Sequence, residues 1–132
     1  MKSKIKKFPL FFSSIKAGFP SPADDFIENR LDLNDYLIEH PEATFFVRVS
    51  GDSMINAGIH SGDLLIVDKS LKAESGDVVV AVVDGEFTVK RLKKVKNRIF
   101  LVPENPNYPI IEIKEGRDFM IWGVVKHVIH SF

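Results

Sequence analysis

Short runs of apolar and β-branched residues, each bounded by turn signals, fill the chain from residue 44 onward. The dipeptide Asp84-Gly85 separates two of these runs, and it is a strong signal for a two-residue β-hairpin. Runs of this length and composition indicate strands. The predicted strands are 44–49, 63–67, 78–83, 87–92, 98–102, 110–113 and 119–129. The sequence therefore predicts a mostly β domain with hairpin connections.

The first 30 residues differ from the rest of the chain. Three prolines and Gly18 interrupt any helix or central strand there, so this segment predicts an extended, mobile arm. Asp32 is a suitable N-cap for a short helix that runs to about Glu39. At 132 residues a single domain is expected. We therefore predict an N-terminal arm over residues 1–30 and a β-rich domain over residues 31–132.

Positive and negative charges are segregated along the chain, although 18 Lys+Arg and 18 Asp+Glu give a formal net charge of zero. The first 17 residues carry five lysines and no acid, whereas residues 24–42 are strongly acidic. A second basic cluster spans residues 90–98. The zero balance argues against a protein that coats nucleic acid with its whole surface. A solvated face is the favoured interpretation of the second basic cluster.

Composition excludes several kinds of chemistry. The chain has no cysteine, and therefore no disulfide, thiolate nucleophile or thiolate metal site. Its longest purely apolar run has six residues, whereas a membrane-spanning helix needs roughly 20. The basic start and the apolar patch before Ala17 have some features of a signal peptide, but a charge and a large residue stand where small residues are needed. The four histidines lack metal-ligand spacing and the glycines form no phosphate-binding loop, so no metal or cofactor is predicted.

One loop can carry an exposed nucleophile. Ser50-Gly51-Asp52-Ser53-Met54 breaks abruptly out of the predicted strand that precedes it. A serine on such a turn can be held exposed beside backbone N–H groups that stabilise an oxyanion. Taken alone, the pattern is more often a loop without a catalytic role. A nucleophilic serine needs a base, and the poor placement of the histidines directs attention to lysine, because Ser–Lys catalysis is an established variant.

Lys90 is the lysine whose surroundings differ from those of the others. It lies in the strand directly after the hairpin turn, where Thr88 and Leu92 share its face. Both faces of this strand are partly apolar, so Lys90 can be desolvated, and its pKa can then fall below the ordinary value of about 10.4. The pattern alone still favours an exposed strand lysine that continues a basic surface.

Motifs along nearly the whole chain resemble those of the self-cleaving serine peptidases of the LexA/UmuD type. They occur in the family's order at residues 17–23, 50–54, 62–68, 84–92, 101–105 and 122–125. The resemblance implies a small peptidase domain of twisted antiparallel sheets, β-clip-like, with one short helix and an extended N-terminal arm. A short arm stands where LexA-like repressors carry a helix-turn-helix domain, so direct sequence-specific DNA binding is not expected.

The resemblance also assigns roles to residues of this chain. Ser53 matches the family's nucleophile and Lys90 its general base, and Ala17–Gly18 matches the bond that is cleaved. The backbone near Ser53 and Asp52 would then form the oxyanion hole. No metal or cofactor is implied. The sequence allows cleavage within one chain or between the partners of a dimer.

The same resemblance implies a role in the bacterial SOS response, in the cytoplasm. A RecA filament on single-stranded DNA would stimulate self-cleavage. The shortened homodimer would then join a UmuC-like subunit as an accessory subunit of an error-prone translesion DNA polymerase. Removing residues 1–17 takes away five lysines and no acid, which would change the net charge from zero to about −5.

Two other functions remain open from the sequence. One is a catalytically silent β-rich interaction module that binds partners through the basic cluster at residues 90–98. The other is a signal-peptidase-like Ser/Lys protease that acts on other proteins. The lack of a membrane anchor in the sequence argues against the second.

Overall fold

The computed structural model describes residues 6–11, 17–18 and 27–132. The chain forms two compact units, Met1–Glu39 and His40–Phe132, and each is described here by itself. Most of the predicted arm lies outside the described residues. Its mobility and its boundary at residue 30 therefore stay predictions.

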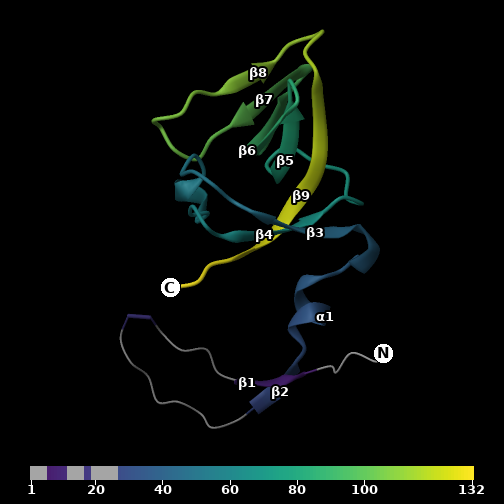
Figure 1. The fold of residues 1–132 in the computed structure, drawn as a ribbon, viewed down its shortest axis with the longest axis vertical. Helices are drawn as coiled ribbons and strands as arrows, with labels where there is room; N and C mark the ends of the chain where they lie inside the picture. The colour runs from purple at the N-terminus through teal and green to yellow at the C-terminus, as the bar shows by residue number, and fades with distance from the viewer. Residues whose placement is uncertain (1–5, 12–16, 19–26) are drawn as a thin grey trace. The chain divides into compact units, whose positions relative to one another are not determined.

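A two-stranded antiparallel ribbon forms part of the first unit (Figure 1). Strand β1 (Phe8–Phe11) pairs with β2 (Ile27–Leu31), with Phe8 opposite Leu31. Both strands of such a ribbon are edges, so Pro9, which has no N–H to donate, is tolerated within β1. The extended conformation predicted for this segment agrees with β1, whereas β2 is a strand that the sequence analysis missed.

The short helix α1 (Leu33–Leu37) follows β2. Asp32 caps it as predicted, because its carboxylate Oδ1 accepts a hydrogen bond from the Asn34 N–H at 2.9 Å. The helix ends at Leu37, two residues before the predicted end, and Ile38 already has an extended backbone. Among the described residues, no helix is long and apolar enough to span a membrane.

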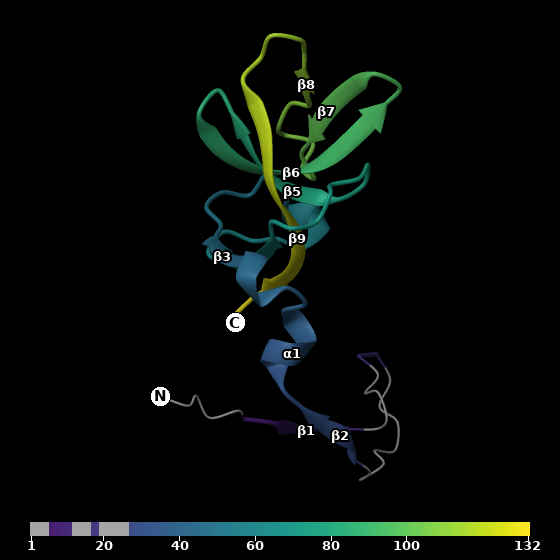
Figure 2. The same ribbon diagram turned by 90° about the vertical axis from the view of Figure 1, so that its right-hand side faces the viewer.

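A seven-stranded sheet forms the second unit, and every neighbouring pair of strands in it is antiparallel. Its order is β3-β4-β9-β5-β6-β7-β8, and β3 and β8 lie at opposite ends of the unit in Figures 1 and 2. The strands are β3 (Thr44–Arg48), β4 (Leu64–Asp68), β5 (Val78–Val83), β6 (Glu86–Val95), β7 (Arg98–Val102), β8 (Ile111–Ile113) and β9 (Phe119–Ile129). Two single 3₁₀ turns occupy Pro41–Ala43 and Ile55–Ala57. The predicted mostly β, antiparallel fold is confirmed, and the described strands do not close into a barrel.

The long strand β9 connects the two halves of this sheet (Figure 1). Its C-terminal half pairs with β4 and its N-terminal half pairs with β5. The register shifts in each pairing, between Ile66 and Val67 in β4 and between Val80 and Ala81 in β5. Such irregularities bend a strand and increase its twist. One strand can therefore serve two sheet halves that face different parts of the core.

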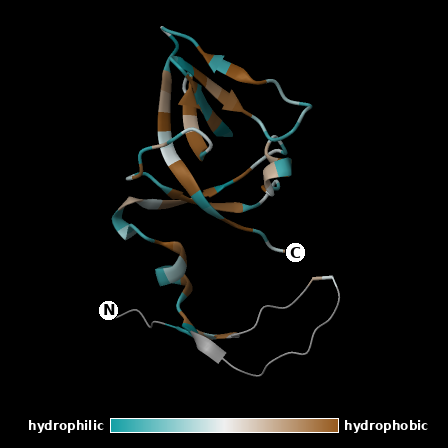
Figure 3. Cartoon of the chain, turned by 180° about the vertical axis from the view of Figure 1, so that it is seen from behind, coloured by the Kyte–Doolittle hydropathy of each residue, from teal (hydrophilic) through white to brown (hydrophobic). Residues whose placement is uncertain are grey.

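The core of the second unit consists of two apolar clusters, in keeping with the hydrophobic colour along its strands (Figure 3). The buried residues of the first cluster are Ala73, Val79, Ala81, Val83, Leu92, Leu101 and Val124. Those of the second are Met54, Ile59, Leu65, Val67 and Val80. Alternate residues of β5 enter different clusters, as the two-residue period of a strand requires. The strand is therefore buried on both of its faces.

The predicted hairpin at Asp84-Gly85 is confirmed. Asp84 and Gly85 have φ angles of 50° and 83°, and two successive positive φ angles are what a type I′ turn requires. The turn brings β6 back along β5, with Lys90 opposite Val79. Strand β6 extends beyond the predicted range to Val95, because its ladder with β7 continues there.

Gly123 allows β9 to cross close to β4. A Cβ atom at this position would lie 2.5 Å from Val67 Cγ1 and 3.3 Å from the Asp68 carbonyl oxygen. Val67 is fully buried and cannot move aside cheaply. We therefore expect Gly123→Ala to lower the free energy of unfolding by about 1–3 kcal/mol, measured by urea denaturation.

The exposed Met120→Ala on the same strand is the matched control, and it should change stability by no more than about 0.5 kcal/mol. The double variant Gly123→Ala, Val67→Ala should lose less stability than the sum of the single losses, because the smaller side chain relieves the contact. A Gly123→Ala chain as stable as the parent would contradict this account of the crossing.

Candidate functional site

The loop that carries Ser53 leaves β3 sharply and is fastened by the residue that follows the serine. Met54 is 2% exposed and packs in the second apolar cluster. Backbone hydrogen bonds between Val49 and the turn before β4 hold the other end, with Val49 N–H to Asp63 O at 2.9 Å. Gly51 has a φ of 96°, a conformation that glycine adopts without strain. Ser53 itself stays partly accessible between these two anchors.

A second loop clamps the serine loop from its other side. The buried Asn105 side chain donates to the Asp52 carbonyl oxygen at 2.9 Å, and the Tyr108 hydroxyl donates to Asp52 Oδ1 at 2.6 Å. The backbone of Glu104 accepts from the Asn56 N–H at 2.9 Å. In the sequence, only the resemblance to the LexA/UmuD-type peptidases pointed to residues 101–105. A second clue lies in residues 103–109, which are rich in proline and asparagine. Such residues form tight turns, and a tight turn can hold side chains in fixed positions.

The side-chain hydrogen bond from Tyr108 to Asp52 raises the pKa of the Tyr108 phenol, because the neutral hydroxyl is the donor. A backbone hydrogen bond from Asp52 opposes this rise. The prediction that the backbone near Ser53 and Asp52 forms an oxyanion hole stays a prediction.

Lys90 lies on β6 and is buried, with 9% of its surface exposed. This burial differs from the exposed strand lysine that the sequence pattern alone favoured. Burial lowers the pKa of the Lys90 ammonium below its ordinary value of 10.5, because the charged form is desolvated. Its Nζ atom lies within hydrogen-bond distance of three oxygens, Ser53 Oγ at 3.1 Å, Thr88 Oγ1 at 2.7 Å and Val89 O at 3.1 Å.

The structure thus brings together two predicted residues that are 37 positions apart in the chain. Both line a cavity of about 420 Å³. Apolar side chains from four strands, β3, β5, β6 and β9, line it, among them Val47, Val80 and Trp122. Phe87 contacts Trp122 edge to face, with ring centroids 6.0 Å apart. The arrangement offers a hydroxyl, a desolvated amine and an apolar groove beside them.

The two residues of the predicted cleavage site belong to the first unit. Ala17 and Gly18 lie in the segment between β1 and β2, and both are exposed. Exposure is what a segment that is to be cleaved requires. The prediction that the bond between them is the one cleaved stays a prediction.

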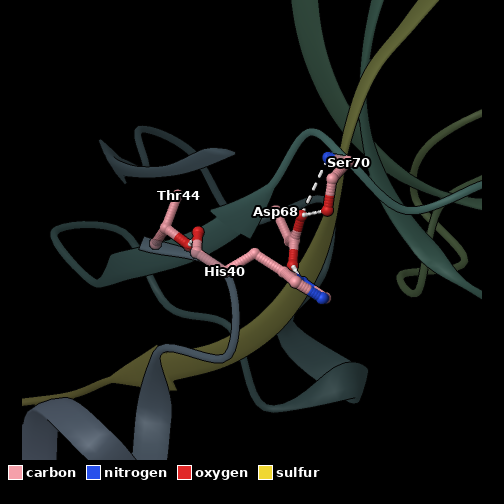
Figure 4. Close-up of polar contacts among 4 residues, drawn as sticks. All are labelled: His40, Thr44, Asp68 and Ser70. Carbon is pink, nitrogen blue, oxygen red and sulfur yellow. Dashed lines mark hydrogen bonds and ion pairs between the residues drawn. The ribbon is translucent and has the colours of Figure 1, made fainter. Parts of the chain in front are cut away.

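A second polar cluster contains the residue types of a Ser-His-Asp triad but not its order (Figure 4). Asp68 accepts from Ser70 at 2.6 Å and contacts His40 Nδ1 at 2.5 Å. In a triad the histidine lies between the serine and the acid, whereas here the acid lies between the other two. Burial acts to raise the pKa of Asp68, but the hydrogen bonds from Ser70 and His40 outweigh it and hold the pKa below its ordinary value. Since Thr44 Oγ1 donates to His40 O at 2.7 Å, the cluster joins the start of β3 to the end of β4.

Two of the four histidines, His60 and His130, come together in the structure although their spacing along the chain indicates no shared site. His60 and His130 both meet Asp63, which is 3% exposed. The hydrogen bonds from the His60 N–H and the His130 side chain hold the pKa of Asp63 below its ordinary value. Motif spacing could not predict this cluster, because His130 comes 67 residues after Asp63 in the chain.

The basic cluster at residues 90–98 is interrupted in the structure. Lys90 is buried, Arg91 pairs with Glu104 at 2.6 Å, and Arg98 makes two hydrogen bonds of 2.9 Å with Glu112. The cluster therefore presents fewer unpaired charges than the sequence suggests. This argues against the alternative function in which an interaction module binds partners through residues 90–98.

The clamp by Asn105 gives a testable prediction. Asn105→Ala removes the donor to the Asp52 carbonyl, and we expect a loss of about 1–3 kcal/mol in the free energy of unfolding. Backbone amides of residues 50–58 should also exchange faster with deuterium, measured by mass spectrometry. Asn107→Ala, at an exposed side chain in the same loop, is the control. Equal exchange in the two variants would show that Asn105 does not hold the serine loop.

Comparison with known proteins agrees with the fold and the motifs. The family model described as "Peptidase S24-like" matches residues 9–126. SamA of Salmonella typhimurium is 56% identical over 123 residues, which cover 93% of this chain and 85% of SamA. ImpA of Escherichia coli is 50% identical over 127 residues, covering 92% of this chain and 83% of ImpA. LexA repressor 1 of Geobacter sulfurreducens is 46% identical over 112 residues, covering 84% of this chain and 55% of the repressor. The chain therefore belongs to the S24 peptidase family, the SOS-related self-cleaving serine peptidases of the LexA/UmuD type.

Proposed function

We propose that Ser53 and Lys90 form a catalytic dyad that cleaves the chain's own Ala17–Gly18 bond. The observation that carries this proposal is the 3.1 Å distance between Lys90 Nζ and Ser53 Oγ, made by a buried lysine. Nucleophile and base must lie within hydrogen-bond reach of each other, at about 2.6–3.2 Å. The lowered pKa of Lys90 gives a larger share of the neutral amine at physiological pH than an exposed lysine has.

The oxygens around Lys90 allow its lone pair to point at the Ser53 hydroxyl. A protonated amine has three donors, and it meets three acceptors. A neutral amine has two N–H donors and one lone pair. The Val89 carbonyl can only accept, so it takes one N–H, and the Thr88 hydroxyl can accept the other. The lone pair is then left for the Ser53 hydroxyl, which reverses its hydrogen bond and donates to Nζ.

The reaction follows from that orientation. Lys90 takes the proton as Ser53 Oγ bonds to the Ala17 carbonyl carbon, and the carbonyl π pair moves onto oxygen. The backbone N–H groups of Ser53 and Asp52 are the candidates to stabilise this oxyanion. The C–N bond then breaks, and Lys90 returns the proton to the Gly18 amine. Water, deprotonated by the same lysine, hydrolyses the Ala17 ester and restores Ser53.

The groove beside the dyad suits an extended, largely apolar segment with a small residue at the cut. Its walls are mostly apolar, and residues of the Ser53 loop form part of them. A small residue at Ala17 and a glycine after it permit close approach and a kink of the backbone. Ser53 follows Gly18 by 35 residues, so the scissile bond is tethered to its own catalytic groups, and effective concentration replaces diffusional capture. A dimer partner's segment can use the same groove.

We further propose the biological setting that family membership suggests. A RecA filament on single-stranded DNA stimulates the cleavage in the bacterial cytoplasm. The shortened chain, as a homodimer, joins a UmuC-like subunit and acts as accessory subunit of an error-prone translesion polymerase. Loss of residues 1–17 removes five lysines, and a charge change of that size can redirect partner choice without altering the core.

Incubation of the purified chain at mildly alkaline pH, followed by mass measurement, tests the dyad. We expect two fragments that end at Ala17 and begin at Gly18. Ser53→Ala and Lys90→Ala should each reduce the rate by at least about 100-fold, the size of a general-base contribution. Lys93→Ala, on the same strand but exposed, should cleave at the parental rate. Undiminished cleavage in either dyad variant would remove that residue from the mechanism.

The same assay distinguishes self-cleavage from the two alternative functions, and it tests whether RecA filaments stimulate the cleavage. RecA filaments should raise the parental rate and leave the Ser53→Ala chain intact. An intact parent both with and without filaments would favour a catalytically silent module. Cleavage of an unrelated preprotein, but not of the chain's own segment, would favour a signal-peptidase-like enzyme.

A further inference from the structure

We propose that His60, Asp63 and His130 form a binding site for a divalent transition metal ion of the Zn²⁺ type. One ligand atom from each of the three side chains lies within 4.8 Å of the other two. The site is separate from the dyad, and none of its three residues lines the cavity of Ser53 and Lys90. The proposal therefore stands or falls independently of the proposed cleavage.

The pairing of two strands brings these residues together. Leu64 and Ile129 are opposite each other where β4 pairs with β9. Asp63 precedes the first of these residues and His130 follows the second, so they are the next cross-strand neighbours. His60 reaches the same point because its own N–H donates to Asp63 Oδ2 at 2.8 Å and closes a tight turn. Two segments that are distant in sequence thus meet at one end of the sheet.

The carboxylate of Asp63 is already held where a ligand needs to be. It is 3% exposed, and one oxygen is fixed by the His60 N–H. The other oxygen contacts His130 Nδ1 at 2.5 Å. A metal ion would replace this contact with one bond to the oxygen and one to an imidazole nitrogen. The fixed carboxylate means that only the two histidines need to turn.

The histidines are arranged to converge and to leave room for water. Their ring centroids are 4.9 Å apart, so small rotations bring a nitrogen of each ring toward a common point. Both side chains are more than two-fifths exposed, which gives an ion access from solvent. Zinc sites with three protein ligands complete their tetrahedron with water. The exposed Phe132 ring lies edge to face against His130, with ring centroids 5.5 Å apart.

The donor set selects the kind of ion. Two imidazole nitrogens and one carboxylate oxygen suit Zn²⁺, Cu²⁺, Ni²⁺ or Co²⁺, whereas Mg²⁺ and Ca²⁺ prefer sites made of oxygen atoms. Arg48 lines a neighbouring cavity of about 320 Å³ together with Asp63 and His130. Its guanidinium donates to the Gly62 carbonyl at 2.9 Å. This positive charge repels every divalent cation, so binding has to depend on the bonds to the imidazole nitrogens and the carboxylate.

Calorimetric titration of the full chain with Zn²⁺ at pH 7.5 tests the site directly. The chain carries Ser53→Ala, so that it stays intact whatever the dyad does. We expect one ion per chain, with affinity at least tenfold weaker in His60→Ala and in His130→Ala. His127→Ala, in strand β9 and outside the cluster, should bind as the parent does. Mg²⁺ should give no measurable binding at the same concentration.

Thermal unfolding supplies an independent readout. An ion that binds only the folded chain raises the melting temperature, and the increase should be lost in His60→Ala and His130→Ala but kept in His127→Ala. These two substitutions remove exposed side chains, so the variants should fold. Parental Zn²⁺ affinity in both variants, or no stoichiometric binding by the parent, would overturn the proposal and leave the cluster as an ion pair that satisfies Asp63.

Discussion

The contact between a desolvated lysine and a serine hydroxyl is the interaction on which the site depends. An exposed lysine is almost fully protonated at neutral pH and cannot accept a proton. Burial of Lys90 on β6 changes this, because it disfavours the charged form. In the proposed mechanism, the 3.1 Å contact to Ser53 places the base where the nucleophile needs it. Strand and loop have to be held rigidly for this contact to persist.

The sheet supplies that rigidity through β9. By pairing with β4 at one end and β5 at the other, β9 ties the sheet half next to the serine loop to the hairpin that carries Lys90. Gly123 permits the close crossing. Met54 anchors the serine loop in the core, while Asn105 holds it from the opposite loop. The geometry of the proposed dyad and the stability of the fold therefore depend on the same contacts.

Features set by neighbouring residues in the sequence could be predicted, whereas features set by contacts between distant residues could not. The strand at 78–83 and the turn at Asp84-Gly85 were predicted correctly, because apolar runs and turn chemistry are local signals. The end of β6 at Val95 was missed, since lysines there carry no apolar pattern and the strand is set by pairing with β7. Asn105 and His130 act through residues more than 50 positions away. The roles of Ser53 and Lys90 came from the resemblance, and pattern alone favoured an exposed Lys90.

Titration of the Lys90 side chain by NMR tests the central claim most directly. The experiment follows the ¹³Cε shift in Ser53→Ala chains with labelled lysine, assigned with Lys90→Arg. Desolvation predicts that Lys90 titrates below 10.5 and apart from the exposed lysines. The cleavage rate of the parent should rise with pH through that same pKa, because the neutral amine is the base. A Lys90 that titrates together with the exposed lysines, or a rate that does not rise with its deprotonation, would contradict the account.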